Sequence, residues 1–287
     1  MSTSLVTVIT GTSSGFGYDT ARVLAADGHR VFATMRDVTG RNAEPARALS
    51  ALGASVVELD VTDDASVERG AARVLDAAGR VDVLVNNAGT AHFGTTEAFT
   101  PQSFERQLAT NVIGPFRVSR AFLPGMREHR SGLVIFVSSI AGRFVIPFTG
   151  LYTASKWAVE GLAEAFSYEL RPFGIEVAIV EPGPYATHIG NVTVMPDDAA
   201  RLASYGDVAK GIETVGAALG ARIRDPIEVA EAIAALVGMP PGSRPLRTVS
   251  PADSPIAAVN EETAPIQRRA LEAYGFGPLL SPRAAVV

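Results

Sequence analysis

The segment YTASKWAVEGL places two groups capable of proton chemistry, Tyr152 and Lys156, four residues apart. Residues at this spacing share one face of a helix, so the lysine ammonium can act on the tyrosine hydroxyl. A free tyrosine has a pKa of about 10, and a fixed positive charge nearby favours its phenolate. Lysine is rare here, since only Lys156 and Lys210 occur among 25 basic residues. The alternative is an amphipathic helix with an exposed lysine and a half-buried tyrosine.

The elements that must position this pair alternate along the chain. Short apolar, β-branched runs lie at 5–10, 30–35, 55–60, 81–85, 132–139 and 175–182, with a short one at 246–250. Helix-like segments lie at 17–27, 63–78, 101–129, 153–171 and 225–238. The nearly continuous apolar character is typical of parallel strands covered on both faces. The alternation predicts an α/β fold, a single doubly wound parallel sheet of about seven strands with helices on both faces.

The chain is predicted to form one domain, residues 1–250, followed by a C-terminal tail, residues 251–287. Residues 184–224 show no strand signal and weak helical periodicity. A long insertion at that point is more often a lid over a binding site than a linker. In the tail, repeated prolines break the pattern and leave one short helix at 265–274.

Composition excludes several function classes. A net charge of −5 without a basic stripe argues against nucleic acid or an anionic membrane as the main partner. There is no cysteine, and the four scattered histidines have no metal-ligand spacing, so no metal site is expected. The N-terminus has no leader-like pattern, and no apolar stretch reaches the roughly 18 residues that span a bilayer. We therefore expect a cytoplasmic protein.

A glycine-rich turn, TGTSSGFG, follows the first predicted strand and opens a helix. Such a turn brings backbone N–H groups and the positive end of the helix to a pyrophosphate, because side chains there would block its approach. The alternative is a tight turn that needs positive φ. The candidate phosphate-binding residues are Gly11, Ser13, Ser14, Gly15, Phe16 and Gly17.

Four more polar or glycine-containing segments follow predicted strands: LDV, NNAG, SS and EPG. Ligands of open parallel sheets bind outside the carboxyl ends of the strands, so these segments should meet in one crevice. With TGxxxGxG, NNAG, a mid-helix asparagine, serine, YxxxK and PG in this order, the chain resembles the short-chain dehydrogenase/reductase family over about residues 4–250. The segment VFATMRD is similar to the hydroxysteroid and retinol dehydrogenase branch of that family.

The resemblance implies a Rossmann-type NAD(P)-dependent oxidoreductase with the catalytic set Asn111, Ser139, Tyr152 and Lys156. Tyr152 would protonate the alkoxide left by hydride addition to a carbonyl. Lys156 would also bind the nicotinamide ribose, and Ser139 would hold the substrate oxygen. Asn111 would support a water in a proton relay. A strand-end cap is the alternative for Ser139, and a buried, satisfied amide is the alternative for Asn111.

The resemblance also implies cofactor contacts beyond the glycine loop and the Tyr–Lys pair. They are Asp60 and Val61 at the adenine, Asn87, Ala88 and Gly89 along the ribose and pyrophosphate, Pro182 and Gly183, and Thr187 at the carboxamide. An acid at the end of the second strand would favour NAD(H), but Met35 and Arg36 stand there. An arginine can pair with a 2′-phosphate, so NADP(H) is favoured. Asp37 keeps NAD(H) as the alternative.

The expected substrate is a small-molecule ketone, aldehyde or alcohol of hydrophobic character. Phe144, Ile146, Phe148 and Tyr185 would line its pocket beside Ser139 and Tyr152, although each aromatic or aliphatic side chain can equally be packing. Arg143 and His188 are candidates for a polar substituent, with a surface role as the alternative. Family members commonly pair through the Tyr152 helix, whose 162–170 segment carries an apolar stripe, so we expect a homodimer or homotetramer.

Two other functions compete with this prediction. A dinucleotide-binding sensor or scaffold would keep the cleft without turnover, but it needs no proton donor. A lyase or epimerase could use the same tyrosine and lysine with a permanently bound cofactor. Net consumption of NADPH by a ketone would exclude both for that substrate.

Overall fold

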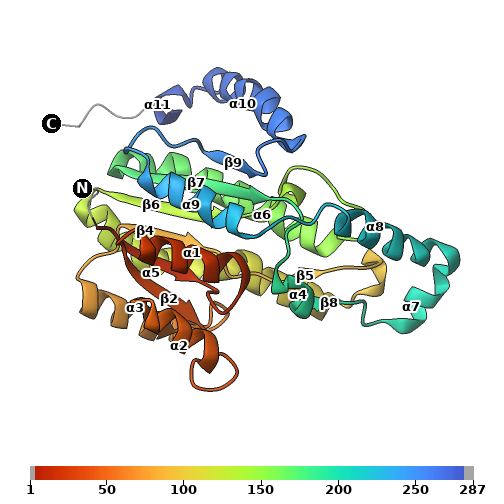
Figure 1. The fold of residues 1–287 in the computed structure, drawn as a ribbon. Helices are drawn as coiled ribbons and strands as arrows, with labels where there is room; N and C mark the ends of the chain where they lie inside the picture. Colours follow the sequence, from red (N-terminus) through yellow and green to blue (C-terminus); the bar gives the residue numbers. More distant parts are fainter. Residues whose placement is uncertain (1–3, 281–287) are drawn as a thin grey trace.

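The computed structural model describes residues 4–280, and seven parallel strands form its central sheet (Figure 1). In spatial order the strands are β3 (Ser55–Glu58), β2 (Arg30–Met35), β1 (Val6–Thr10), β4 (Val83–Asn86), β6 (Gly132–Val137), β7 (Ile175–Pro182) and β9 (Arg247–Ser250). The order runs outward from β1 to β3 and then resumes on the other side of β1 with β4. The β1–β4 junction is therefore the switch point at which such sheets bind ligands.

Helices cover both faces of the sheet, which confirms the doubly wound α/β prediction. One face carries α3 (Asp64–Ala78), α5 (Gly114–His129) and α6 (Gly150–Leu170), packed against strand residues such as Val8. The other face carries α1 (Gly15–Ala26), α2 (Ala43–Ala51) and α9 (Ile227–Gly238), packed against residues such as Ile9. Successive side chains of a strand point to opposite faces, so a central strand such as β1 contributes to two cores. This explains the nearly continuous apolar runs.

The single helix expected at 101–129 is divided into three parts. It consists of α4 (Pro101–Leu108), a π-helical turn (Ala109–Ile113) and α5. A π turn inserts an extra residue into the helix and is frequent at functional sites. Here the turn contains the buried Asn111.

The segment expected to lack strands contains short elements instead. They are β8 (Thr193–Val194), α7 (Ala199–Ser204) and α8 (Gly211–Gly220). β8 pairs in parallel with β5 (Ala91–His92), far away in the sequence. The prediction was wrong on this point because two-residue strands are too short to produce a periodic signal.

The C-terminal segment is more helical than expected. α10 (Ile256–Ala273) begins nine residues before the predicted helix and includes Pro265, and α11 (Gly277–Leu280) follows it. Pro255 fits the helix start, and Pro265 is exposed in the interior. The helix lies beside β9, the edge strand of the sheet (Figure 1). No helix within residues 4–280 has the length and apolar character needed to cross a bilayer.

Candidate active site

The glycine loop between β1 and α1 has no room for side chains. Gly11 has φ +70°, and a Cβ there would lie 2.8 Å from the Ala88 Cα. A Cβ on Gly17 would lie 2.4 Å from the Gly11 carbonyl oxygen and 2.3 Å from Asn87 Nδ2. Real Cβ atoms do not approach other atoms this closely, so the backbone of the loop and the NNAG segment pack directly on each other.

The start of α1 has the backbone geometry expected of a phosphate-binding site. Ser14 is the N-cap residue, in extended conformation, and its side chain makes no capping bond. The first N–H groups of a helix lack intrahelical partners and carry partial positive charge. Asn87 Nδ2 holds the loop in place by donating to the Thr10 carbonyl (2.8 Å) and the Gly11 carbonyl (3.1 Å). The cradle therefore fits a dinucleotide pyrophosphate, with Ser13 and Phe16 in the same loop.

The loop after β7 comes close to this cradle. A Cβ on Gly15 would lie 3.3 Å from Thr187 Cβ, so Thr187 borders the start of α1. Pro182 ends β7, and the following Gly183 N–H donates to the Ser250 carbonyl (2.7 Å). The structure thus brings the predicted EPG and Thr187 positions beside the predicted glycine loop.

Tyr152 and Lys156 lie together near the start of α6. Lys156 Nζ lies 5.6 Å from the centroid of the Tyr152 ring and donates to the Val137 carbonyl (2.9 Å). Lys156 is only 7% exposed. Burial lowers the pKa of Lys156 to about 8, against the opposing effect of Glu160. Burial also raises the pKa of Tyr152, and its hydroxyl's contact with Ser139 works in the other direction.

Ser139 lies where β6 ends and a 3₁₀ turn (Ile140–Gly142) begins. Its Oγ accepts from the Ala141 N–H (3.1 Å) and donates to the Pro182 carbonyl (3.4 Å). The capping alternative is therefore real, yet the same hydroxyl interacts with Tyr152. The two roles are compatible, because the cap holds the Ser139 hydroxyl beside the Tyr152 hydroxyl.

Asn111 belongs to a buried polar network behind the Tyr–Lys pair. Its Oδ1 accepts from the Thr90 N–H (2.9 Å), and its Nδ2 donates to the Thr90 carbonyl (2.9 Å) and to Ser155 Oγ (3.1 Å). Gln107, one turn earlier, donates to the same Thr90 carbonyl (2.9 Å) and to Ser155 (3.3 Å). The side chain of Asn111 is thus a satisfied amide, as the alternative proposed.

Sequence reasoning missed three members of this network, Thr90, Gln107 and Ser155. Gln107 and Asn111 are amides four residues apart in one predicted helix, a spacing that puts them on the same face and was a usable signal. The network also lies close to Lys156. A Cβ on Gly89 would lie 3.5 Å from Asn111 Oδ1 and 4.0 Å from Lys156 Nζ, so NNAG, Asn111 and Lys156 meet at one point.

Arg36 and Asp37, the two charged candidates for binding the adenosine end of the cofactor, both follow β2 but have different partners. The Arg36 guanidinium is 53% exposed and lies 3.7 Å from the Asp60 carboxylate. Partial burial raises the pKa of Asp60, but hydrogen bonds from Thr62 and the Arg36 charge outweigh it, so the net pKa is lowered. Asp37 instead accepts from the backbone N–H of Arg41 (3.1 Å). Its carboxylate is thereby engaged within its own loop.

The predicted substrate-lining residues divide into two groups. Phe144 is 39% exposed and Ile146 is half-buried, both on the segment between Ser139 and Tyr152. Tyr185 is buried in the core, its ring packs on Phe16 at 5.5 Å, and its hydroxyl bonds to Ser250 (2.7 Å). The packing alternative therefore fits Tyr185.

Arg143 is also bound within the protein. Its guanidinium donates to Asn260 and Thr263 of α10, so it is engaged with the C-terminal helix. The side chain of His188 lies outside the described part of the structure.

Two phenylalanines lie beside α8: Phe148, which the sequence analysis expected at the substrate pocket, and Phe93, which it missed. A Cβ on Gly211, at the start of α8, would lie 2.6 Å from the Phe148 ring, and one on Gly216 would lie 3.7 Å from the Phe93 ring. Phe148 has φ +62° and its carbonyl accepts from the Gly94 N–H (2.7 Å). The segment after Ser139 therefore packs under α8 through aromatic side chains.

Comparisons with known proteins agree with this geometry. A family model described as short chain dehydrogenase matches residues 5–195. The chain is 41% identical over 182 residues to 3-ketodihydrosphingosine reductase of Bacteroides thetaiotaomicron, covering 63% of this chain and 64% of that protein. It is 42% identical over 189 residues to human 17-beta-hydroxysteroid dehydrogenase type 1, covering 63% and 57%. It is 39% identical over 185 residues to human retinol dehydrogenase 8, covering 63% and 58%. The match thus spans less than two thirds of each relative.

Solved structures match over nearly the whole chain. A short-chain dehydrogenase from Streptomyces avermitilis superposes with a TM-score of 0.78 at 32% identity, covering 96% of this chain and 99% of that one. Actinorhodin polyketide ketoreductase with NADPH gives 0.72 at 31% identity, covering 87% and 97%. A 3-ketoacyl-(acyl-carrier-protein) reductase from Brucella melitensis with NADH gives 0.71 at 25% identity, covering 87% and 97%.

Proposed function

The chain belongs to the short-chain dehydrogenase family, and from this premise we propose that it is an NADP(H)-dependent oxidoreductase that interconverts a hydrophobic ketone or aldehyde with its alcohol. The observation that carries the proposal is the meeting of Ser139, Tyr152 and Lys156 beside a phosphate cradle whose Gly11 and Gly17 have no room for a Cβ. The relatives from the hydroxysteroid and retinol branch support the same assignment.

The proposed mechanism follows from the positions of the three side chains. When bound, NADPH supplies the hydride that reduces the carbonyl carbon. Ser139 Oγ donates a hydrogen bond to the carbonyl oxygen and stabilises its developing charge. Tyr152 then gives its proton to that oxygen, and in the oxidation direction it takes the proton back. The Lys156 ammonium stabilises the phenolate that Tyr152 becomes, and it also donates to the nicotinamide ribose.

The preference for NADP(H) is supported by the charges at the end of β2. Arg36 is exposed there and can bind a phosphate with charge-assisted hydrogen bonds. Asp37 is engaged with its own loop, which weakens the NAD(H) alternative. Asp60 competes for Arg36 at 3.7 Å, so a 2′-phosphate must replace this ion pair.

A bulky apolar substrate is supported by the aromatic character of the segment after Ser139. Phe144 lies exposed on that segment, while Phe148 and Phe93 lie under α8. Residues 184–224 would act as the lid within a domain of residues 1–250. The names of three relatives refer to a keto-sphingoid base, a steroid and retinol, all largely apolar compounds.

The proposal also covers the oligomeric state of the protein. The apolar stripe of α6 that we expected to pair subunits packs in the chain's own core through Ala163, Phe166 and Leu170. A homodimer would instead use the exposed Phe116 and Trp157 on the outer side of α5 and α6. Sedimentation at micromolar concentration tests this, and a monomeric mass contradicts it. We also propose a cytoplasmic location, as the sequence analysis expected.

The function is tested first by titrating the protein with NADPH and NADH while following nicotinamide fluorescence. Removing the charge-assisted bonds in Arg36→Ala should weaken NADPH binding roughly 10- to 100-fold and leave NADH binding within about twofold. Stronger NADH binding that does not depend on Arg36 would assign the ribose to Asp37.

Turnover is then tested with a panel of apolar and polar ketones. NADPH consumption with apolar ketones should fall by at least about 100-fold in Tyr152→Phe, because the proton donor is lost. Activity limited to small polar carbonyls would contradict the substrate class. Binding of NADPH without turnover on any carbonyl would favour the sensor or scaffold.

A further inference from the structure

The C-terminal helix α10 docks on the body of the protein through a polar stripe. Ile256, Asn260, Thr263 and Gln267 follow one another at spacings of four, three and four residues, so they share one helix face. Ile256 is buried, while the three polar side chains all bond to residues outside the helix. Such a stripe specifies one docking position through hydrogen bonds more than through apolar burial.

Asn260 is the residue that joins two different segments. Its Oδ1 accepts from Arg143 Nε (2.7 Å), and its Nδ2 donates to Glu181 Oε2 (2.5 Å). Thr263, one turn later, accepts a second bond from Arg143 Nη2 (2.8 Å). The Asn260 oxygen thus accepts from the Arg143 cation, and the Asn260 nitrogen donates to the Glu181 carboxylate. These two partners determine the orientation of the amide.

Both partners of Asn260 border the catalytic groups. Arg143 directly follows the 3₁₀ turn that Ser139 starts, and its N–H donates to the Ile140 carbonyl (3.0 Å). Glu181 directly precedes Pro182, whose carbonyl accepts from Ser139 Oγ (3.4 Å). The hydrogen bonds of Asn260 to Arg143 and Glu181 therefore connect the 139–143 turn with the end of β7. Ser139 connects the same two segments through its bond to Pro182.

The carboxylate of Glu181, which Asn260 binds, is fully buried and lies among other charged groups. Glu181 is 0% exposed, and its neighbours are Arg247 at 3.5 Å and the buried Glu160, which Arg247 also binds (2.9 Å). Burial and the charge of Glu160 raise the pKa of Glu181 to about 7, and the hydrogen bond from Asn260 and the charges of Arg247 and Arg143 oppose this. A buried carboxylate without enough partners must relax or take up a proton. Asn260 supplies one of these partners.

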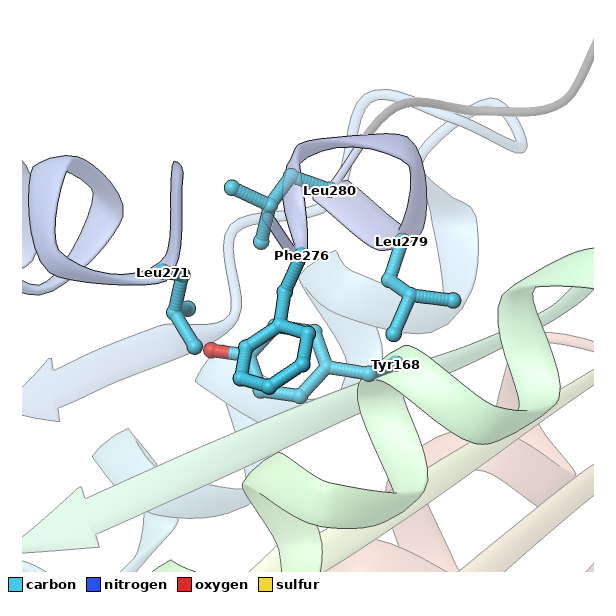
Figure 2. Close-up of a pocket in the computed structure, with 5 residues that line it drawn as sticks. All are labelled: Tyr168, Leu271, Phe276, Leu279 and Leu280. Atoms are coloured by element: carbon cyan, nitrogen blue, oxygen red, sulfur yellow. The ribbon is translucent and has the colours of Figure 1, made fainter. Parts of the chain in front are cut away.

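The far end of the C-terminal segment is anchored as well. Leu271, Phe276, Leu279 and Leu280 gather around Tyr168 of α6 and line a cavity (Figure 2). Arg171 donates to the Leu280 carbonyl, and the Tyr168 hydroxyl donates to Glu164 (2.5 Å). The helix is therefore held at both ends, and the region predicted as a tail is packed on the catalytic domain.

We propose that α10 completes the active site from behind and that Asn260 is a positioning residue for Ser139. This inference rests on the proposed function, since Ser139 matters only if a substrate oxygen binds there. Asn260 keeps the 139–143 turn and the end of β7 at a fixed separation, so that the Ser139 hydroxyl stays in line with Tyr152. The C-terminal helix is then part of the catalytic unit.

The test compares two single variants, a compensating double variant and a control. Asn260→Asp keeps the acceptor for Arg143 but turns a carboxylate toward Glu181, and Asn260→Ala removes both bonds. Asn260→Asp combined with Glu181→Gln exchanges donor and acceptor, so the bridge can form again with opposite polarity. Glu261→Ala changes the exposed neighbour on the same helix and serves as the control.

Each variant is examined by steady-state kinetics with NADPH and an apolar ketone. Both single variants should lose about 10- to 100-fold in kcat, as expected for a displaced catalytic group, with NADPH affinity within about twofold. The double variant should recover most of the loss relative to Asn260→Asp. Normal kcat in both single variants would overturn the proposal. Loss of kcat and NADPH affinity together, without recovery in the double variant, would also overturn it because that pattern indicates general loosening.

Amide hydrogen exchange provides a readout that does not need turnover. The N–H groups of Ala141, Gly142 and Arg143 are bonded within the turn, so they should exchange faster in the single variants and return to the wild-type rate in the double variant. If the wild-type protein reduces no carbonyl but the exchange pattern appears, the proposed function fails and the structural role of Asn260 stands. Unchanged exchange in a folded Asn260→Ala variant contradicts the positioning role itself.

Discussion

The two walls of the active site are built on opposite principles. The wall of β1, α1 and β4 depends on glycines that let backbone segments pack directly on each other, since added Cβ atoms on Gly11 or Gly17 would collide with backbone. The wall of β6 and α6 works by buried polar side chains, such as Lys156, whose charge and bonds are set by their neighbours. The first wall is therefore sensitive to added volume, and the second is sensitive to changes of charge and hydrogen-bond geometry.

The largest effect expected on the side-chain wall comes from Lys156→Arg, which keeps the charge but changes its geometry. The planar guanidinium is wider than the ammonium, and it cannot donate to Val137 and approach Tyr152 in the same way. We expect kcat to fall by about 100-fold or more, within the range of general acid–base contributions. Steady-state kinetics measures this, with circular dichroism to show that the variant is folded. Near-normal turnover would mean that charge alone is sufficient.

The largest effect expected on the glycine wall comes from Gly17→Ala, which adds one methyl group. Its Cβ would lie 2.4 Å from the Gly11 carbonyl oxygen, so the loop must shift. We expect stability to fall by about 1–3 kcal/mol, the usual cost of overpacking, and NADPH binding to weaken clearly. Urea unfolding and fluorescence titration measure the two effects.

Gly125→Ala is the matched control, because this glycine lies in α5 with nothing within 4 Å of an added Cβ. There the same methyl group should stabilise the protein by roughly 0.5–1 kcal/mol, since alanine loses less backbone entropy in a helix. Equal effects of the two substitutions would remove the distinction between the walls.

A smaller effect should follow from Glu160→Gln, which removes a charge from behind the side-chain wall. Burial lowers the pKa of Lys156 to about 8, and the Glu160 charge keeps it from falling lower. Lys156 is charged below that pH and loses its charge as the pH rises through it. Without the carboxylate the lysine pKa falls further, so the alkaline loss of ketone reduction should begin at lower pH. Arg247 retains Glu164 and Glu181 as partners.

The pH profile of kcat measures this shift, with Glu169→Gln on the exposed side of α6 as the control. Because Lys156 and Lys210 are the only lysines, NMR of lysine-labelled protein can also follow the titration directly. An unchanged alkaline limb and an unchanged Lys156 titration in the variant would show that Glu160 does not act on Lys156.

The smallest effect is expected at α8, in the segment that we propose as a lid and that belongs to neither wall. A Cβ on Gly211 would lie 2.6 Å from the end of the Phe148 ring, and a ring can turn more easily than backbone can move. Gly211→Ala should change KM for an apolar ketone by a few-fold, in line with a small change in a hydrophobic pocket, and leave NADPH binding unchanged. Gly220→Ala at the other end of α8 has open space and is the control. A large loss of NADPH affinity would place α8 against the cofactor instead.

The comparison also explains which residues sequence reasoning found. The glycine wall was predictable because backbone requirements act locally, and glycines between a strand and a helix have few other uses. Tyr152 and Lys156 were predictable because one helical turn joins them. The network of Thr90, Gln107, Asn111 and Ser155 was only partly found, since its members come from three separate segments.

The sequence by itself determined the order of strands and helices, the doubly wound sheet and the position of the glycine loop. These depend on periodicity and turn chemistry over a few residues, which are written locally in the chain. Tertiary structure alone decided that Tyr185 is a core residue, that Arg143 faces Asn260 and that α10 continues through Pro265. The physical reason is that each of these depends on which distant partner satisfies a polar group or covers an apolar one, and no local pattern records that choice.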